Sequence, residues 1–157
     1  MRKPIRLTLS AALMVAAAAA HAADYAIDTK GAHAFIQFHI KHLGYSWLVG
    51  RFNTFDGEFS YDENNPQAAR ISVNIDPASV DSNHAERDKH LRGEDFLAVD
   101  EYPEARFVST GFSENDDGTA TLSGDLTLHG VTRRISIEVQ HIGHGPDPWG
   151  GYRRGFQ

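Results

Sequence analysis

From residue 34 onward, apolar and polar residues alternate along much of the chain with a period of two. In residues 34–42, Ile36, Phe38 and Ile40 share one face, while polar side chains occupy most of the other. Further alternating runs lie at residues 55–61, 71–75, 120–129 and 134–141. This period is typical of antiparallel strands that bury one face and expose the other. The pattern therefore predicts an all-β domain.

Turn-forming residues separate the alternating runs. DENNP at 62–66, NDDG at 115–118 and HGVT at 129–132 each combine residues that favour tight turns. An antiparallel sheet of this length normally curls and closes, because closure removes its exposed edges. We therefore predict a small antiparallel barrel with an almost entirely apolar inner face.

A charged segment, SNHAERDKHLRGEDF at Ser82–Phe96, interrupts the alternation. Asn83 followed three residues later by Glu86 is typical of a capping box, and Gly93 is a common stop signal. We therefore predict a short helix over Ser82–Arg92 between two strands. Within it, we expect charged side chains to pair one turn apart, Glu86 with His90 and Asp88 with Arg92.

Three roles are open for this charged segment. It can be an active site, a surface helix held by its own ion pairs, or a polar cover over the mouth of the barrel. A catalytic site would need an unpaired acid or base in a cleft. We favour the covering role, in which Leu91 and Phe96 face inward and the charges stay in water.

The first residues read as a secretory signal peptide. Three basic residues, Arg2, Lys3 and Arg6, precede the apolar run Leu7–Ala20, and Ala20-His21-Ala22 resembles a cleavage site. The apolar run is shorter than the roughly 20 residues that a membrane-spanning helix needs. We therefore expect residues 1–22 to be removed and residues 23–157 to form one domain without a stable membrane anchor.

Charge and cysteine content exclude several functions. Loss of the three basic residues would take the formal net charge from −6 to −9, so the domain is poorly suited to nucleic acid or to anionic membrane surfaces. The chain has no cysteine, so no disulfide or thiol chemistry is available. Stability must therefore come from the core.

No metal-binding or catalytic pattern stands out. The histidines lack the i,i+4 helical spacing of a zinc site, and no G-x-S-x-G nucleophile elbow occurs. We assign no catalytic residue, no metal and no cofactor. The loop HGPDPWGGYRRGF, residues 144–156, carries Trp149, which either covers the barrel end or contributes to a ligand mouth.

Five stretches together resemble the YceI family of exported proteins. They are HAFIQFHIKHLGYSWLVGRFNTFDGEF, SVDSNHAERDKHLRGEDFL, YPEARFVST, LSGDLTLHGVTRRISIEV and GHGPDPWGGYRRGF. The resemblance implies a lipocalin-like antiparallel barrel in the periplasm of Gram-negative bacteria, enclosing a long apolar pocket for a polyisoprenoid or another amphiphile, isoprenoid quinone included. It implies no catalytic residues. Family members continue beyond the GYRRGF motif, so we expect this chain to be C-terminally incomplete, lacking roughly twenty to thirty residues of closing strands.

These observations define a hypothesis for the site. Apolar side chains on inward faces are expected to line the ligand cavity: Ile36, Phe38, Ile40, Phe55, Phe59, Ile71, Val73, Leu91, Phe96, Phe107, Leu122, Leu126, Ile135 and Ile137. The head-group end is assigned to His42, Arg92 and Trp149. The alternatives are a periplasmic enzyme acting on a small hydrophobic substrate and a stress-related structural protein with a filled core. The two-faced strands would also permit a homodimer.

Overall fold

The computed structural model describes residues 22–157, so the predicted signal peptide, residues 1–22, lies outside it except for its last residue. The strands are β1 Ala23–Ala26, β2 Ile36–His42, β3 Ser46–Phe52, β4 Phe55–Tyr61, β5 Arg70–Ile75, β6 Val80–Asp81, β7 Ala105–Glu114, β8 Ala120–Leu128, β9 Val131–Val139, β10 His141–Pro146 and β11 Tyr152–Phe156. The helices are α1 Ala85–Arg92 and the 3-10 helices Pro66–Ala68 and Pro77–Ser79. The predicted all-β class with one short α-helix is confirmed over this range.

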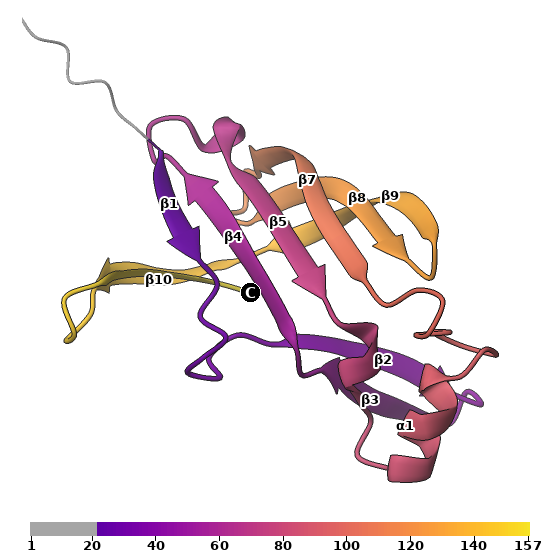
Figure 1. Cartoon of the computed structure of the whole chain (residues 1–157). Helices are drawn as coiled ribbons and strands as arrows, with labels where there is room; N and C mark the ends of the chain where they lie inside the picture. The colour runs from indigo at the N-terminus through magenta and orange to yellow at the C-terminus, as the bar shows by residue number, and fades with distance from the viewer. Residues whose placement is uncertain (1–21) are drawn as a thin grey trace, which may run out of the picture.

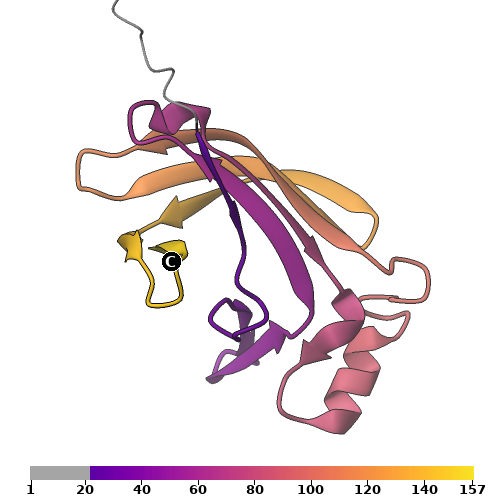
Figure 2. The same cartoon turned by 60° about the vertical axis from the view of Figure 1, so that its left-hand side comes forward.

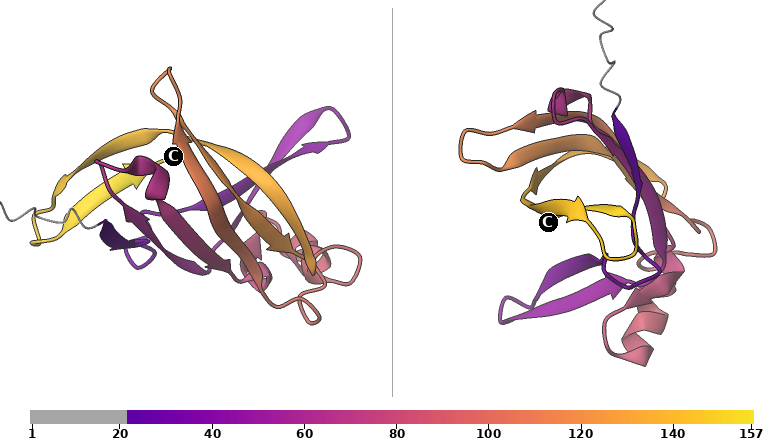
Figure 3. Two further views of the ribbon diagram at one scale, coloured as in Figure 1. Left: turned by 90° about the horizontal axis from the view of Figure 1, so that it is seen from above. Right: turned by 90° about the vertical axis from the view of Figure 1, so that its left-hand side faces the viewer.

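The main element is a six-stranded antiparallel sheet with the order β1-β4-β5-β7-β8-β9 (Figure 1). It is strongly curved, and two hairpins lie on its concave side (Figures 2 and 3). One hairpin, β10-β11, forms a sheet of its own, and the other joins a three-stranded sheet, β2-β3-β6. The curvature follows from the twist that antiparallel strands acquire when several pair in succession.

The barrel prediction is confirmed only in part. Among residues 22–157 the strands form three sheets, β1 and β9 remain unpaired edges of the largest, and no closed barrel is present. The barrel does not close because β3 pairs with β6 and not with a strand of the large sheet. In this pairing Arg51 lies opposite Asp81, and Phe52 lies opposite Val80.

Two predicted turns are confirmed. Between β8 and β9, Leu128 faces Val131, so only His129 and Gly130 form the turn. Both have positive φ, 50° and 69°, as a two-residue turn matched to strand twist requires. The β7-β8 turn closes with a hydrogen bond from Asn115 N to Thr119 O.

A β-bulge changes the phase of β7. Ser109 pairs with Gly124, whereas Gly111 pairs with Ser123, and the register shifts between them. Phe112 therefore faces the same side of the sheet as Phe107, although it lies five positions further along the strand, an odd number. The bulge adds an aromatic ring to the concave face.

The fully buried core is small. Its apolar members are Ala69, Val80, Ala98, Ala105, Phe107 and Ala120. Most other apolar side chains on the concave face are half-buried. This face is therefore apolar but not filled by its own side chains. Within the described range, no helix has the length and apolarity needed to span a bilayer.

The charged helix begins later than predicted. α1 starts at Ala85, and its N-cap is His84, whose Nδ1 accepts a hydrogen bond from Arg87 N at 3.2 Å. Asn83 instead adopts a left-handed conformation, with φ 62°. The predicted capping box of Asn83 and Glu86 is therefore wrong, because a ring nitrogen of the next residue takes the capping position.

Candidate functional site

The concave face of the large sheet is lined by aromatic and aliphatic side chains in register. Phe59 on β4 pairs with Ile71 on β5, and Phe107 on β7 pairs with both Val73 and Leu126. Because strand side chains alternate between faces, these positions point to one side. The result is a continuous apolar surface across the inner strands of the sheet.

The β10-β11 hairpin packs on this surface through Phe156. Its ring lies 5.7 Å from that of Phe59, edge to face, and 6.1 Å from that of Tyr61. Tyr25 of β1 stacks on the other side of Phe59 at 4.6 Å. Tyr61 in turn meets Phe112 edge to face at 6.1 Å. The hairpin is thus held above the sheet by an aromatic cluster.

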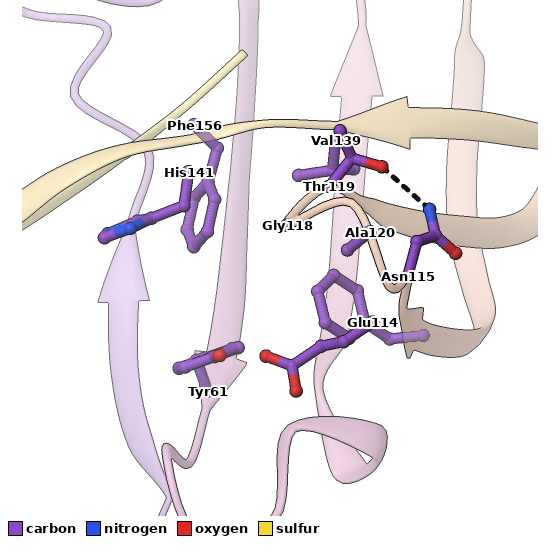
Figure 4. Close-up of a pocket in the computed structure, with 10 residues that line it drawn as sticks. Tyr61, Glu114, Asn115, Gly118, Thr119, Ala120, Val139, His141 and Phe156 are labelled. Carbon is purple, nitrogen blue, oxygen red and sulfur yellow. Dashed lines mark hydrogen bonds between the residues drawn. The ribbon is translucent and has the colours of Figure 1, made fainter.

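A pocket of about 280 Å³ opens beside this cluster (Figure 4). Its lining residues are Tyr61, Phe112, Glu114, Asn115, Gly118, Thr119, Ala120, Val139, His141 and Phe156. They come from β4, the β7-β8 hairpin, the end of β9, and both strands of the β10-β11 hairpin. The pocket is therefore the gap left between the large sheet and the hairpin.

Polar groups border the apolar walls of this pocket. The Glu114 carboxylate is directed toward Tyr61 across the pocket (Figure 4). Burial raises the pKa of the Tyr61 phenol, and the negative charge of Glu114 raises it further. The Tyr61 hydroxyl and the Glu114 carboxylate thus place two polar groups, directed toward each other, at the apolar wall of the pocket.

A second bulge brings His141 and His144 to the same face of β10. The register with β11 shifts between His141 and Gly143. Nδ1 of His144 lies 3.1 Å from Nε2 of His141, and His144 Nε2 lies 3.7 Å from the Glu63 carboxylate. A line of polar side chains therefore leads from Glu63 to the pocket wall at His141.

Arg154, on β11, extends this line of polar side chains. Its side chain is only 6% exposed, and its guanidinium carbon lies 4.7 Å above the ring of Tyr61. One terminal nitrogen donates to the Glu63 carboxylate, whereas its Nε has no hydrogen-bond partner in the described structure. This Nε is itself buried, and Arg154 is not among the residues that line the pocket, so its guanidinium packs on Tyr61 and does not border the pocket.

A second hollow, of about 320 Å³, lies mainly on the convex side of the sheet. It is bordered by the polar residues Asp24, Glu58, Ser60, Arg70, Ser72 and Ser109, and also by the apolar side chains of Phe59, Ile71 and Val108. Among residues 22–157, no group of three or more His, Asp and Glu side chains could hold a metal ion.

The charged segment serves a structural role that the sequence did not predict. Asp88 is buried and accepts hydrogen bonds from both N and Oγ of Ser82. Hydrogen bonding by the Ser82 hydroxyl holds the pKa of Asp88 below its usual value. Arg87 also donates to Ser82, through Nε at 2.7 Å. The expectation that all charges of the helix stay in water is wrong for Asp88.

The expected helical ion pairs differ too. Asp88 uses one carboxylate oxygen for Ser82, and Arg92 donates to the carbonyl oxygens of Ala78 and Val80, so the segment is tied to β6. His90 makes its ion pair with Asp95, at 3.6 Å. Asp88 and Arg92 thus bond to the segment that precedes the helix, and not to each other one turn apart.

Nine of the fourteen predicted lining residues share the concave face of the large sheet. They are Phe55, Phe59, Ile71, Val73, Phe107, Leu122, Leu126, Ile135 and Ile137. Ile36, Phe38 and Ile40 lie on β2, in the separate three-stranded sheet. Leu91 is half-buried on α1, and Phe96 is about half exposed, with its ring against His90.

The three predicted head-group residues occupy separate elements. His42 ends β2, Arg92 ends α1, and Trp149 lies 80% exposed in the β10-β11 turn. The sequence interpretation also omitted Arg154, Phe112 and Glu114. Because of the bulge in β7, alternation with a period of two assigns Phe112 and Glu114 to the wrong face of the sheet. Nothing in the local pattern indicates that Arg154 is buried.

Comparison with known proteins gives consistent results. The model of the YceI-like domain matches residues 25–156. A UPF0312 protein of Shewanella denitrificans is 53% identical over 156 residues, covering 99% of this chain and 82% of the relative. A UPF0312 protein of Ectopseudomonas mendocina is 57% identical over 138 residues, covering 88% and 72%.

Solved structures agree with the fold. A crystal structure of the Campylobacter jejuni YCEI protein is 29% identical, covers 84% of this chain and 76% of that chain, and superposes with a TM-score of 0.66. Burkholderia cenocepacia BcnA is 21% identical, covers 69% and 67%, and gives a TM-score of 0.64. The latter supports the similarity of fold alone.

Proposed function

Because this chain belongs to the YceI family, we propose that it binds a polyisoprenoid or a related long-chain amphiphile. An isoprenoid quinone is within this class. The observation that carries the proposal is the apolar concave face, which is ordered by strand register yet only half-buried by the protein itself. An apolar chain laid along this face would complete its burial.

The energy of binding would come from removing the chain from water. Each methylene of a ligand contributes about 0.8 kcal/mol when it is buried. A pocket of about 280 Å³ is just below the roughly 300–1,000 Å³ usual for ligand sites. It would therefore hold one end of a long ligand, with the remainder lying along the sheet.

We place the polar end of the ligand beside Tyr61. Its hydroxyl, the Glu114 carboxylate and the His141 ring border the pocket. These groups suit a hydroxyl group, which can donate to the carboxylate and accept from the phenol or the imidazole. The geometry supports this end better than it supports the dispersed set of His42, Arg92 and Trp149.

We propose binding without catalysis, in the periplasm, after export and removal of residues 1–22. The basic start, apolar run and Ala20-His21-Ala22 motif support export. We also propose that the curved sheet and its two hairpins act together as the wall of a lipocalin-like enclosure around the ligand. The curvature of the large sheet supports this arrangement (Figure 3).

The proposal is tested by identifying what the protein carries. Protein purified from the periplasm without detergent is extracted with organic solvent, and the extract is analysed by mass spectrometry. A prenyl or similar long-chain lipid in stoichiometric amount is expected. Absence of any such lipid, together with no uptake of an added prenyl lipid, would refute the proposed function.

A further inference from the structure

The β2-β3 hairpin ends in an exposed apolar tip. Leu43, Tyr45 and Trp47 are 77%, 91% and 66% exposed. Leu43 and Gly44 have positive φ values of 50° and 82° and lie in the turn between β2 and β3. Exposed aromatic and aliphatic side chains grouped on one tip indicate an interaction surface.

Apolar exposure continues down both faces of the hairpin. Ile40 faces Leu48 on one side, and Lys41 faces Trp47 on the other. Ile40 is 55% exposed. A flat protein partner would cover only one face of this hairpin. An apolar medium that surrounds the hairpin would cover the apolar side chains on both faces, so it fits the hairpin better.

The charge around this tip differs from that of the rest of the chain. Residues 29–55 contain no Asp or Glu, the longest such stretch in a sequence whose net charge is −6. The same stretch carries Lys30, Lys41 and Arg51. Arg51 is paired with Asp81, which leaves Lys41 as the basic residue nearest the tip. The net charge of the domain as a whole disfavours an anionic lipid surface, but the stretch of chain that forms the tip has no carboxylate of its own to oppose adsorption.

We infer that residues 40–49 dock into the interface of an anionic lipid bilayer. Trp and Tyr prefer this interface because their rings are apolar and their polar atoms remain hydrated. Leu43 would enter the acyl region between them, and Lys41 would meet lipid phosphates. The role of this docking rests on the proposed function: the ligand would pass between membrane and protein at the tip.

The other exposed tryptophan fits this role less well. Trp149 is 80% exposed in the β10-β11 turn, but Asp147 lies in the same turn and accepts hydrogen bonds from Trp149 N and Gly151 N. Hydrogen bonding from Gly151 lowers the pKa of Asp147, so this turn carries a carboxylate. Arg153 pairs with this carboxylate at 2.8 Å, and its guanidinium carbon lies 5.6 Å from the centroid of the Trp149 ring. Trp149 is therefore already engaged by a charged side chain of its own hairpin and serves as the internal comparison.

Fluorescence separates the two tips, because Trp47 and Trp149 are the only tryptophans in the chain. Exported protein with a verified N-terminus is prepared as W149F, which reports Trp47, and as W47F, which reports Trp149. Vesicles of phosphatidylethanolamine and phosphatidylglycerol are added, with and without brominated lipid. We expect Trp47 emission to shift to the blue and to be quenched, and Trp149 emission to stay unchanged. Unchanged Trp47 emission would overturn the proposal.

A variant removes the tip without touching the pocket. Leu43→Ser with Tyr45→Ser should weaken vesicle binding about tenfold or more, because two apolar side chains no longer leave water. The control, Leu128→Ser with Val131→Ser, removes exposed apolar side chains at the β8-β9 turn and should bind vesicles normally. Equal vesicle binding by the two variants would overturn docking. Docking would also be overturned if the only effect of the tip variant were loss of dimerisation, and the partner of the tip would then be a second copy of the chain.

Ligand binding is measured separately, with a soluble fluorescent prenyl probe and no vesicles. The tip variant should bind the probe like the unmodified protein but transfer it between vesicles about tenfold more slowly, in proportion to the lost docking. A normal transfer rate would overturn the link between docking and transfer. Failure of every form to bind the probe, with the Trp47 shift intact, would refute the proposed function and leave the docking established.

Discussion

The ring of Phe107 on β7 covers the backbone of Gly124 on β8. A Cβ added at Gly124 would lie 2.3 Å from Cζ of that ring and 2.7 Å from the carbonyl oxygen of Val108. Both distances are shorter than van der Waals contact, so an added methyl group would require the ring or the strand backbone to shift. The missing Cβ of Gly124 therefore allows the buried ring of Phe107 to approach the backbone of β8 closely.

This close approach predicts the cost of adding a methyl group. Gly124→Ala should destabilise the fold by about 1–3 kcal/mol through overpacking. Gly111→Ala is the control, because nothing lies within 4 Å of its added Cβ. Urea unfolding measures both. Equal midpoints for the two variants would show that the ring moves aside and that the contact is not tight.

Phenylalanines on the concave face should differ in their contribution to stability. Phe107 is buried, whereas Phe59 is half-buried beside the space assigned to the ligand. Phe107→Ala should cost about 3–5 kcal/mol, as is usual for a buried Phe. Phe59→Ala should cost less in unfolding experiments and yet weaken binding of a prenyl probe. A larger loss of stability for Phe59→Ala, with normal probe binding, would indicate a packed core at that position.

Asp88 should hold the charged helix in place. Asp88→Asn weakens the hydrogen bonds from Ser82 and should accelerate amide exchange throughout α1, measured by mass spectrometry. Glu86→Gln, on the same helix and exposed, is the control and should exchange normally. Equal exchange in both variants would mean that the Ser82 contacts do not anchor the helix.

Arg153 links two distant segments in a pH-dependent way. It donates to Asp28 at 2.5 Å and to Asp147 at 2.8 Å, which ties the chain after β1 to the β10-β11 hairpin. Hydrogen bonds, first from Arg153 and then from His33 and the backbone of Gly31, lower the pKa of Asp28 from its usual 3.8 to about 2. A lowered carboxylate pKa stabilises the fold above the unfolded pKa, and this stabilisation is lost as the pH falls through the folded value.

Asp28→Asn should therefore lower the unfolding temperature at neutral pH, and the difference from the unmodified protein should vanish as the pH falls from about 4 to 2. Thermal unfolding followed across that range measures the effect. Asp116→Asn, in the exposed β7-β8 turn, should leave the unfolding temperature unchanged. A difference for Asp28→Asn that persists at the lowest pH would exclude the Arg153 ion pair as its cause.

Local features of the fold could be predicted because short-range chemistry determines them. The turn at His129 and Gly130 needs positive φ at both positions, and the sequence supplies residues that tolerate it. Alternation along β4, β5 and β8 likewise identified which side chains share a face. Strand period and turn chemistry are both readable from neighbouring residues.

Features that depend on partners distant in sequence could not be predicted. Nothing near Arg51 indicates that its strand pairs with Asp81 instead of extending the large sheet. The bulges after Ser109 and His141 change which residues share a face, so Phe112 and His144 were not assigned to the site. Burial of Arg154 depends on the hairpin folding over Tyr61, a tertiary contact that alternation does not encode.

The central claim is that a long-chain amphiphile binds on the concave face beside the pocket. Phe112 and Val108 both lie on β7, but Phe112 lines the pocket, whereas Val108 is exposed on the opposite face. The most direct test is the dissociation constant of a fluorescent prenyl lipid for Phe112→Ser and Val108→Ser, each verified as folded by circular dichroism. We predict about tenfold or more weaker binding for Phe112→Ser, since an aromatic wall is lost, and unchanged binding for Val108→Ser. Equal affinity of both variants and the unmodified protein would contradict the claim.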